Sequence, residues 1–460
     1  MCSLYKIRYY FERNSKGNCK MKKTIECLLI AVLCTAAITF SGHASALAET
    51  SELSDKYNLK EVVVLSRHNI RAPLSGEGSP LAKSMPHTWF SWTSATSELS
   101  LRGGVLETQM GQYFRKWVVS EELMSENAKP TDTEVRFYAN AKQRTIATAQ
   151  YFSSGFLPVA NIRIETNQEY DKMDPVFTPQ FTFMNDAYRE AAQAEMEKLL
   201  PDLTEEYALL TDVIDYHDSE GYKSGELTDF VNGDTEFVLE TGAEPGMKGS
   251  LKTATSISDA LVLQYYEEAD ANKAAFGHDL TPAQWKSISH IKDAYGDVLF
   301  TAPSVCVHLA HPLLEVIDEE LERNDRKFTF LCGHDSNLGS VLASLGITDY
   351  ELENTIEEKT PIGSKLVFEK WADAAGKEFI RLRLVYDSYE QLRTTPMLSL
   401  EQPPMSHVFT VDGLTANEDG LYALADFDSL LDEKIEAYDL QKQQYGIETA
   451  PASVPNTGVY

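Results

Sequence analysis

The chain has 460 residues, and 41 Lys and Arg against 70 Asp and Glu give it a formal net charge of −29. This acidic balance excludes nucleic acid and anionic membranes as expected partners, because both carry charge of the same sign. Basic side chains that gather at one place in such a chain therefore indicate a local site for an anion.

The first 48 residues have the pattern of a secretory signal peptide. A basic start at residues 21–23 precedes an apolar run at 27–40 and the small-residue sequence Ala-Ser-Ala at 44–46. We therefore expect a periplasmic or secreted protein with no membrane attachment after cleavage. Four of the six cysteines lie in this segment, and the other two, Cys306 and Cys332, are expected either as a disulfide or as buried free thiols.

Three apolar runs in the rest of the chain predict buried parallel strands. They cover residues 61–65, 135–139 and 327–332, and each is followed by a polar turn and a helical pattern. After the third run, apolar residues at 338, 341, 342 and 345 have the spacing of an amphipathic helix. The repeated strand, turn and helix predict an α/β fold with a doubly wound, mainly parallel sheet and helices on both faces.

The segment from 171 to 290 differs from its surroundings because helical patterns dominate it, for example at 187–200 and 251–268. We predict that it is a mainly helical insertion domain, and that residues 49–170 and 291–460 together form the α/β catalytic domain. Within the second part, residues 365–371 and 378–386 flank a short turn and predict a hairpin.

A cluster of polar residues follows the first predicted strand as Arg67-His68-Asn69-Ile70-Arg71-Ala72-Pro73. Two guanidinium groups beside an imidazole suit the oxygens of a phosphate and can hold its phosphorus in line for attack. The alternative is an exposed basic turn without a function.

Polar residues also follow the other two predicted strands. Arg144 comes after the second strand, and His334 and Asp335 directly follow the third. Because the carboxyl ends of parallel strands meet at one edge of a sheet, we expect these side chains to lie near His68. A histidine can bind a phosphoryl oxygen, and a neighbouring carboxylic acid can protonate the leaving oxygen of a phosphomonoester.

Other histidines are assigned to ordinary roles. A second His-Asp pair, His217-Asp218, follows no buried strand and is predicted to lie in a solvent-exposed loop. His308 and His311 have i, i+3 spacing on a predicted helix, but no further ligand completes a recognisable metal site. We therefore expect these two to be ordinary packing or surface histidines.

Taken together, Arg67-His68-x-x-Arg71-x-Pro73, Arg144 and His334-Asp335 resemble the histidine acid phosphatases. Within that family, Asn69 and Ser336 resemble bacterial periplasmic glucose-1-phosphatases more than phytases, which usually carry Gly and Thr at these places. The resemblance implies the histidine phosphatase fold, related to phosphoglycerate mutase, with the active site between an α/β domain and a helical domain.

The resemblance also implies a role for each residue. His68 would attack phosphorus and form a phosphohistidine, Asp335 would protonate the leaving alcohol, and four side chains would bind the phosphoryl oxygens: Arg67, Arg71, Arg144 and His334. Neither a metal nor a cofactor is implied.

The function we predict is an exported acid phosphatase that hydrolyses small phosphomonoesters such as glucose 1-phosphate. Activity at acid pH is expected because Asp335 must be protonated when the ester is bound. Three alternatives remain: a phytase that acts on inositol hexakisphosphate, a phosphoryl-transferring mutase of the same fold, and a non-catalytic phosphosugar-binding protein.

Overall fold

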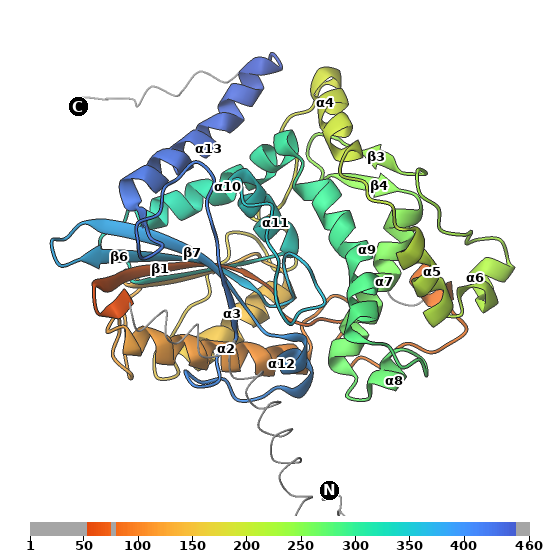
Figure 1. Cartoon of the computed structure of the whole chain (residues 1–460), viewed down its shortest axis with the longest axis horizontal. Helices are drawn as coiled ribbons and strands as arrows, with labels where there is room; N and C mark the ends of the chain where they lie inside the picture. The colour runs from red at the N-terminus through yellow and green to blue at the C-terminus, as the bar shows by residue number, and fades with distance from the viewer. Residues whose placement is uncertain (1–52, 75–79, 448–460) are drawn as a thin grey trace, which may run out of the picture. The chain divides into compact units, whose positions relative to one another are not determined.

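The computed structural model describes residues 53–74 and 80–447 (Figure 1). The predicted signal peptide at 1–48 and the tail from residue 449 lie outside the described residues. The strands are β1 (Tyr57–Arg67), β2 (Val135–Ala139), β3 (Glu236–Val238), β4 (Gly246–Lys248), β5 (Phe328–Gly333), β6 (Lys365–Asp373), β7 (Glu378–Tyr386), β8 (Met405–Val408) and β9 (Tyr422–Ala423).

The helices cover most of the remaining length. The longer ones are α2 (Leu101–Ser120), α3 (Gln143–Phe156), α4 (Asp186–Glu197), α5 (Thr204–Val213), α7 (Ser250–Glu267), α9 (Pro282–Phe300), α10 (Pro303–Leu321), α11 (Asp335–Ser344) and α13 (Leu424–Gln444). The short ones are α6 (Glu220–Lys223), α8 (Ala271–Ala274), α12 (Tyr389–Thr394) and the 3-10 helices η1 (Pro80–Lys83) and η2 (Tyr216–Asp218).

The main sheet is mixed, with strand order β2-β5-β1-β6-β7-β8 and with β9 paired to β7. Strands β2, β5 and β1 are parallel, while β6, β7, β8 and β9 pair in antiparallel fashion. The three predicted parallel strands are thus neighbours, and β6 and β7 form the predicted hairpin. Since Arg67 pairs with Gly333 in register, the carboxyl ends of β1 and β5 lie side by side.

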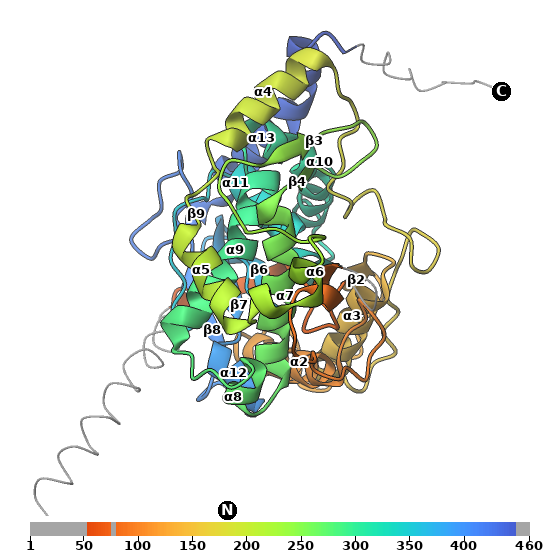
Figure 2. The same cartoon turned by 90° about the vertical axis from the view of Figure 1, so that its right-hand side faces the viewer.

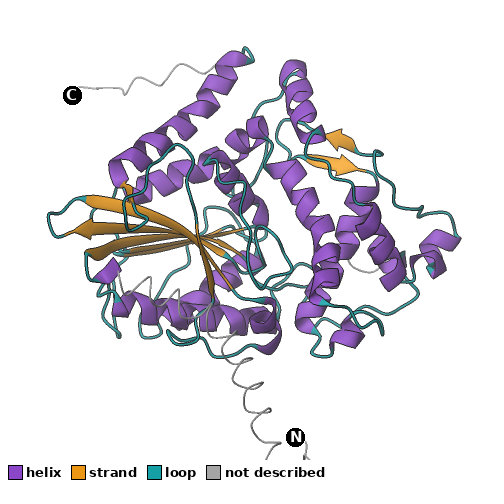
Figure 3. Cartoon of the chain, viewed as in Figure 1, coloured by secondary structure: helices purple, strands orange, loops and turns teal. Residues whose placement is uncertain are grey.

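Helices cover both faces of this sheet, as predicted (Figure 3). Val62 and Val64 of β1 face a cluster that includes residues of α2 and α3, whereas Val63 and Leu65 face residues of α10, α11 and α13. This alternation explains the continuous apolar run of β1, because a strand covered on both faces buries every side chain. The α/β fold predicted from the sequence is confirmed.

Helices α4 to α9 lie beside the sheet rather than on it (Figures 1 and 2). Their buried side chains form a separate hydrophobic cluster around residues such as Tyr188, Leu261 and Trp285. The predicted boundary at residue 290 falls inside α9, and the division into two domains stays a prediction.

In the part of the chain that the structure describes, no single helix has the length and apolar composition needed to cross a membrane. The bent pair α9 and α10 meets that criterion only when both helices are counted together. Both are core helices in this fold, with buried residues such as Ile288 and Leu313.

Candidate active site

The loop after β1 carries the predicted nucleophile, His68, at the end of the parallel strands. Its backbone N–H donates to the carbonyl of Gly333, 3.1 Å away, at the end of β5. Helix α2 approaches this loop closely, because a Cβ on Gly103 would lie 2.5 Å from the carbonyl oxygen of Ile70. Because Gly103 has no side chain, helix α2 can pack directly against the backbone of this loop.

The imidazole of His68 is held in one tautomer. Its Nδ1 lies 2.9 Å from the carbonyl oxygen of Asn69, which can only accept a hydrogen bond. Nδ1 therefore carries the proton, and Nε2 keeps a free lone pair. Burial, and then the charges of Arg144 and Arg71, lower the pKa of His68 well below its usual value, so the ring stays neutral.

Three arginines surround this imidazole. Arg67 donates through Nη1 to Glu357 Oε2 at 2.6 Å, and its Nη2 lies 3.2 Å from Asp335. Arg71 pairs with Asp259 of α7 at 3.1 Å. The buried Nε–H of each of the three arginines has no hydrogen-bond partner among the described residues. Unpaired buried donors are costly, and an anion would be a favourable partner for them.

Arg144, near the start of α3, is the least compensated of these arginines. Burial, together with the neighbouring charge of Arg71, lowers the pKa of Arg144 to about 10. Its Nη2 lies 3.3 Å from Nδ1 of His334. The sequence predicted this arginine from its place after a parallel strand, and the structure brings it to the site.

His334 and Asp335 follow β5 and complete the group. The rings of His334 and His68 meet edge to face with centroids 5.5 Å apart. Asp335 begins α11, and 51% of its side chain is exposed. Although half of the side chain is exposed, loss of solvent within the cavity would by itself raise the pKa of Asp335, but the charges of Arg67 and Lys292 hold that pKa well below its usual range.

One cavity of about 330 Å³ is lined by His68, Arg71, Arg144, His334 and Asp335, and by side chains from α7 and α9. Arg67 is not among its lining residues, but it contacts Asp335. The cavity wall carries both carboxylates and lysines: Glu244, Asp259, Asp293, Asp297, Lys252, Lys292 and Lys359. Sequence reasoning missed these side chains because their relation to His68 depends on contacts across the fold. Among the described residues, no group of three or more His, Cys, Asp and Glu is arranged to hold a metal ion.

Glu357 is a further residue that the sequence did not reveal. Its buried carboxylate accepts from Arg67 and from Lys292 Nζ, at 2.6 and 2.7 Å, and from Tyr266 at 3.1 Å. Lys292 and Arg67 lower the pKa of Glu357 to about 2 against the effect of burial. Glu357 lies 290 positions from Arg67 in the sequence, and no local sequence pattern indicates that the two residues are in contact.

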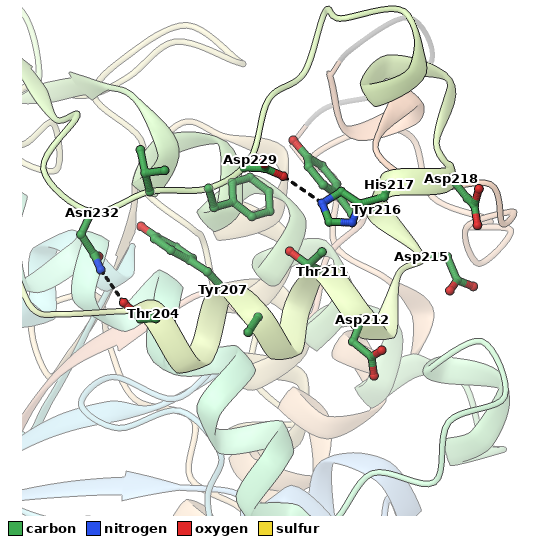
Figure 4. Close-up of a pocket in the computed structure, with 13 residues that line it drawn as sticks. Thr204, Tyr207, Thr211, Asp212, Asp215, Tyr216, His217, Asp218, Asp229 and Asn232 are labelled. Carbon is green, nitrogen blue, oxygen red and sulfur yellow. Dashed lines mark hydrogen bonds and ion pairs between the residues drawn. The ribbon is translucent and has the colours of Figure 1, made fainter.

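The second His-Asp pair lies in a different place, as predicted. His217 and Asp218 are exposed, as predicted, but they belong to the 3-10 helix η2 rather than to a loop, and His217 Nε2 lies 2.8 Å from Asp229. They line an open pocket of about 750 Å³ beside α5 (Figure 4). No arginine is among its lining residues within the part of the chain described here, so the pocket lacks the anion-binding groups found around His68.

The remaining candidates also have structural roles. His308 is buried in α10 and lies 2.7 Å from the backbone N–H of Thr182, and His311 stacks on Tyr438. Cys306 and Cys332 are both buried free thiols and do not form the disulfide that was the other expected state.

Comparison with known proteins agrees with this geometry. Residues 58–386 match the model of the histidine phosphatase superfamily (branch 2). The chain belongs to this superfamily. It is 37% identical to a glucose-1-phosphatase from Salmonella typhimurium and 36% identical to one from Providencia rettgeri, over 89% and 88% of this chain and 99% of each relative.

The fold is also similar to solved phytase structures. A Hafnia alvei phytase in complex with myo-inositol hexakis sulphate matches with a TM-score of 0.74 and 27% sequence identity, over 83% of this chain and 98% of the phytase. The predicted family and the predicted histidine phosphatase fold are thus confirmed.

Proposed function

We propose that this phosphoric monoester hydrolase is an exported acid phosphatase that cleaves small phosphomonoesters such as glucose 1-phosphate through a phosphohistidine. The observation that carries the proposal is the neutral His68, which has a free Nε2 and lines a cavity together with Arg71, Arg144, His334 and Asp335. Export rests on the sequence pattern of residues 1–48. The helical segment 171–290 would supply part of the cavity wall, in keeping with the predicted insertion domain.

The first chemical step follows from these positions. Nε2 of His68 attacks phosphorus while the phosphorus–oxygen bond to the leaving alcohol breaks, and Asp335 transfers its proton to that oxygen. The charge that develops on the phosphoryl oxygens is met by Arg67, Arg71 and Arg144. The products of this step are the free alcohol and phosphohistidine.

Water completes the cycle. The carboxylate of Asp335 accepts a proton from water as the water oxygen attacks phosphorus and the phosphorus–nitrogen bond breaks. Phosphate leaves, and His68 and protonated Asp335 are restored.

The protonation of Asp335 links the mechanism to acid pH. In the free chain, Arg67 and Lys292 hold the pKa of Asp335 low. A bound phosphate ester brings negative charge to the same arginines, which weakens their pull on Asp335 and raises its pKa in the complex. Asp335 in the complex still loses its proton as the solution becomes alkaline, so the rate should fall as pH rises.

The cavity wall favours a sugar phosphate over a polyphosphate. Asp259, Asp297 and Glu244 would accept hydrogen bonds from sugar hydroxyls but would repel further phosphate groups. Lys252 and Lys359 in the same wall support the alternative, a phytase activity on inositol hexakisphosphate. The glucose-1-phosphatase relatives favour the first reading.

The test is phosphate release at acid pH from glucose 1-phosphate and from inositol hexakisphosphate. The variants are His68→Ala and, as a matched control at the other His-Asp pair, His217→Ala. We expect preference for the sugar phosphate, loss with the first variant and no change with the second. Preference for the inositol ester would identify a phytase, and equal activity of His68→Ala would refute the nucleophile. Binding without release of phosphate from any ester would favour the non-catalytic alternative.

A further inference from the structure

Asn140 occupies a fully buried position directly after β2, next to His334. Its backbone N–H donates to the carbonyl of Cys332 at 3.0 Å, which ties the end of β2 to the end of β5. Its side-chain Oδ1 accepts a hydrogen bond from the backbone N–H of Asp174 at 2.9 Å. Because a backbone N–H can only donate, this contact fixes which end of the Asn140 amide is the oxygen.

The other end of the amide is therefore the nitrogen Nδ2, which carries two protons and can only donate hydrogen bonds. It lies 2.7 Å from Nε2 of His334 and 3.1 Å from the sulfur of Met173. An amide nitrogen donates, so Nε2 of His334 must accept and carries no proton. In a neutral imidazole the single ring proton then lies on Nδ1.

His334 is neutral in this environment. Burial, and after it the charge of Arg144, lower its pKa well below the usual value for histidine. Nδ1–H thus faces Nη2 of Arg144 at 3.3 Å, and both groups are donors. Two donors cannot bond to each other, so both need an acceptor in the cavity between them.

A chain of hydrogen bonds around the buried residues Tyr138 and Asp174 holds Asp174 in place beside Asn140. The carboxylate of Asp174 accepts from the hydroxyl of Tyr138 at 2.6 Å, and that hydroxyl accepts from Asn167 at 2.9 Å. The same carboxylate accepts from the backbone N–H of Val176 at 3.0 Å. The orientation of the Asn140 amide is consequently set by the backbone N–H of Asp174, whose own carboxylate is held by Tyr138 and Val176.

We propose that Asn140 is a positioning residue that fixes the Nδ1–H tautomer of His334, so that His334 donates a hydrogen bond to a phosphoryl oxygen beside Arg144. The inference rests on the proposed function, because it takes the acceptor to be a phosphoryl oxygen. The structural part, the tautomer, stands on the contacts alone.

The first test measures the tautomer directly. The full chain is labelled with ¹⁵N-histidine, and the ring nitrogens of His334 are assigned by comparison with His334→Gln. In the wild type we expect a protonated Nδ1 and an unprotonated Nε2. Asn140→Asp replaces the donating nitrogen with an accepting oxygen and should place a proton on Nε2. Tyr138→Phe, which removes a hydrogen bond of the same chain without changing the amide, should leave the wild-type tautomer.

The second test follows the binding of inorganic phosphate by calorimetry, which needs no turnover. In Asn140→Asp, a neutral His334 would carry its proton on Nε2 and turn the lone pair of Nδ1 toward the phosphate. Only the doubly protonated imidazolium would then donate a hydrogen bond from Nδ1 to the phosphate. Phosphate changes its own charge over the same pH range. That change affects the variant and the wild type equally, so it cancels in the ratio of variant to wild-type affinity. We expect this ratio to fall about tenfold as pH rises through the pKa of His334 in the variant, the effect of one hydrogen bond to a charged group.

Asn140→Ala serves if the aspartate variant does not fold. Without the amide, the two ring nitrogens compete for the proton, so mixed tautomers and an affinity lowered about two- to tenfold at every pH are expected. A proton on Nε2 in the wild type, or a wild-type tautomer in both Asn140 variants, would overturn the proposal. If instead the tautomer is as expected but no ester is hydrolysed, the proposed function fails while the positioning role remains.

Discussion

A fully buried ion pair behind the His68 loop offers a quantitative test of the structure. Lys365 Nζ lies 2.9 Å from Glu107 Oε1, and both side chains are 0% exposed. The same oxygen accepts from Nδ2 of Asn69, at 2.8 Å, and Asn69 directly follows the proposed nucleophile His68. We predict that Lys365→Met lowers the free energy of unfolding by about 3–5 kcal/mol at neutral pH, because it leaves a buried carboxylate without its counter-charge.

The loss should depend on pH with a definite sign. Burial already raises the pKa of Glu107 in the folded chain, and removal of Lys365 raises it further above the unfolded value of about 4.3. Between these two values the folded chain binds a proton that the unfolded chain lacks. The free energy of unfolding of the variant therefore falls as pH rises above about 4.3, by up to about 1.4 kcal/mol per pH unit.

Urea unfolding at about pH 5 and about pH 7.5 would measure both effects. The matched control is the double variant Glu107→Gln with Lys365→Met, which removes both charges and should recover most of the lost stability. Phosphatase activity of Lys365→Met should also fall, since Glu107 holds Asn69. A single variant as stable as the wild type at neutral pH, or one whose deficit does not change with pH, would refute this reasoning.

Three other predictions concern single sites. Asp335→Asn should slow hydrolysis of glucose 1-phosphate about 10²- to 10⁴-fold, but p-nitrophenyl phosphate much less, because its leaving group needs no proton; equal losses in kcat would contradict the acid role. In the chain without residues 1–48, Cys306 and Cys332 should resist a thiol reagent until urea unfolds the protein, since burial raises the pKa of Cys306 to about 12. His217→Ala should leave kcat and KM unchanged in a steady-state assay, because its pocket lacks the arginines.

The sequence predicted those parts of the fold that depend on local patterns. The runs at 61–65 and 135–139 became β1 and β2 because a strand covered on both faces must be apolar throughout. The hairpin of β6 and β7 followed from two runs around a short turn. The side chains after β1 and β5 were found because the ends of neighbouring parallel strands share one edge.

The partners of these side chains were not predictable in the same way. Glu357 lies between β5 and β6 in sequence and Asp259 in the middle of α7, yet each pairs with an arginine of the β1 loop. Such pairs arise only when distant elements pack, and neither residue stands out by type in an acidic chain. Asn140 directly follows β2, but its effect on His334 depends on the direction of one amide, which only three-dimensional contacts define.

The distribution of counter-charges explains how an acidic protein can hold a site for an anion. Arg67 and Arg71 already have carboxylate partners, Glu357 and Asp259, in the absence of a ligand. Arg144 has a neutral imidazole beside it instead, and burial lowers its pKa to about 10. We therefore expect an incoming phosphoryl group to gain most from Arg144, since that guanidinium must give up no existing carboxylate. In the proposed reaction, Arg67 and Arg71 would set the position of phosphorus, and Arg144 would provide the charge that lacks a carboxylate partner.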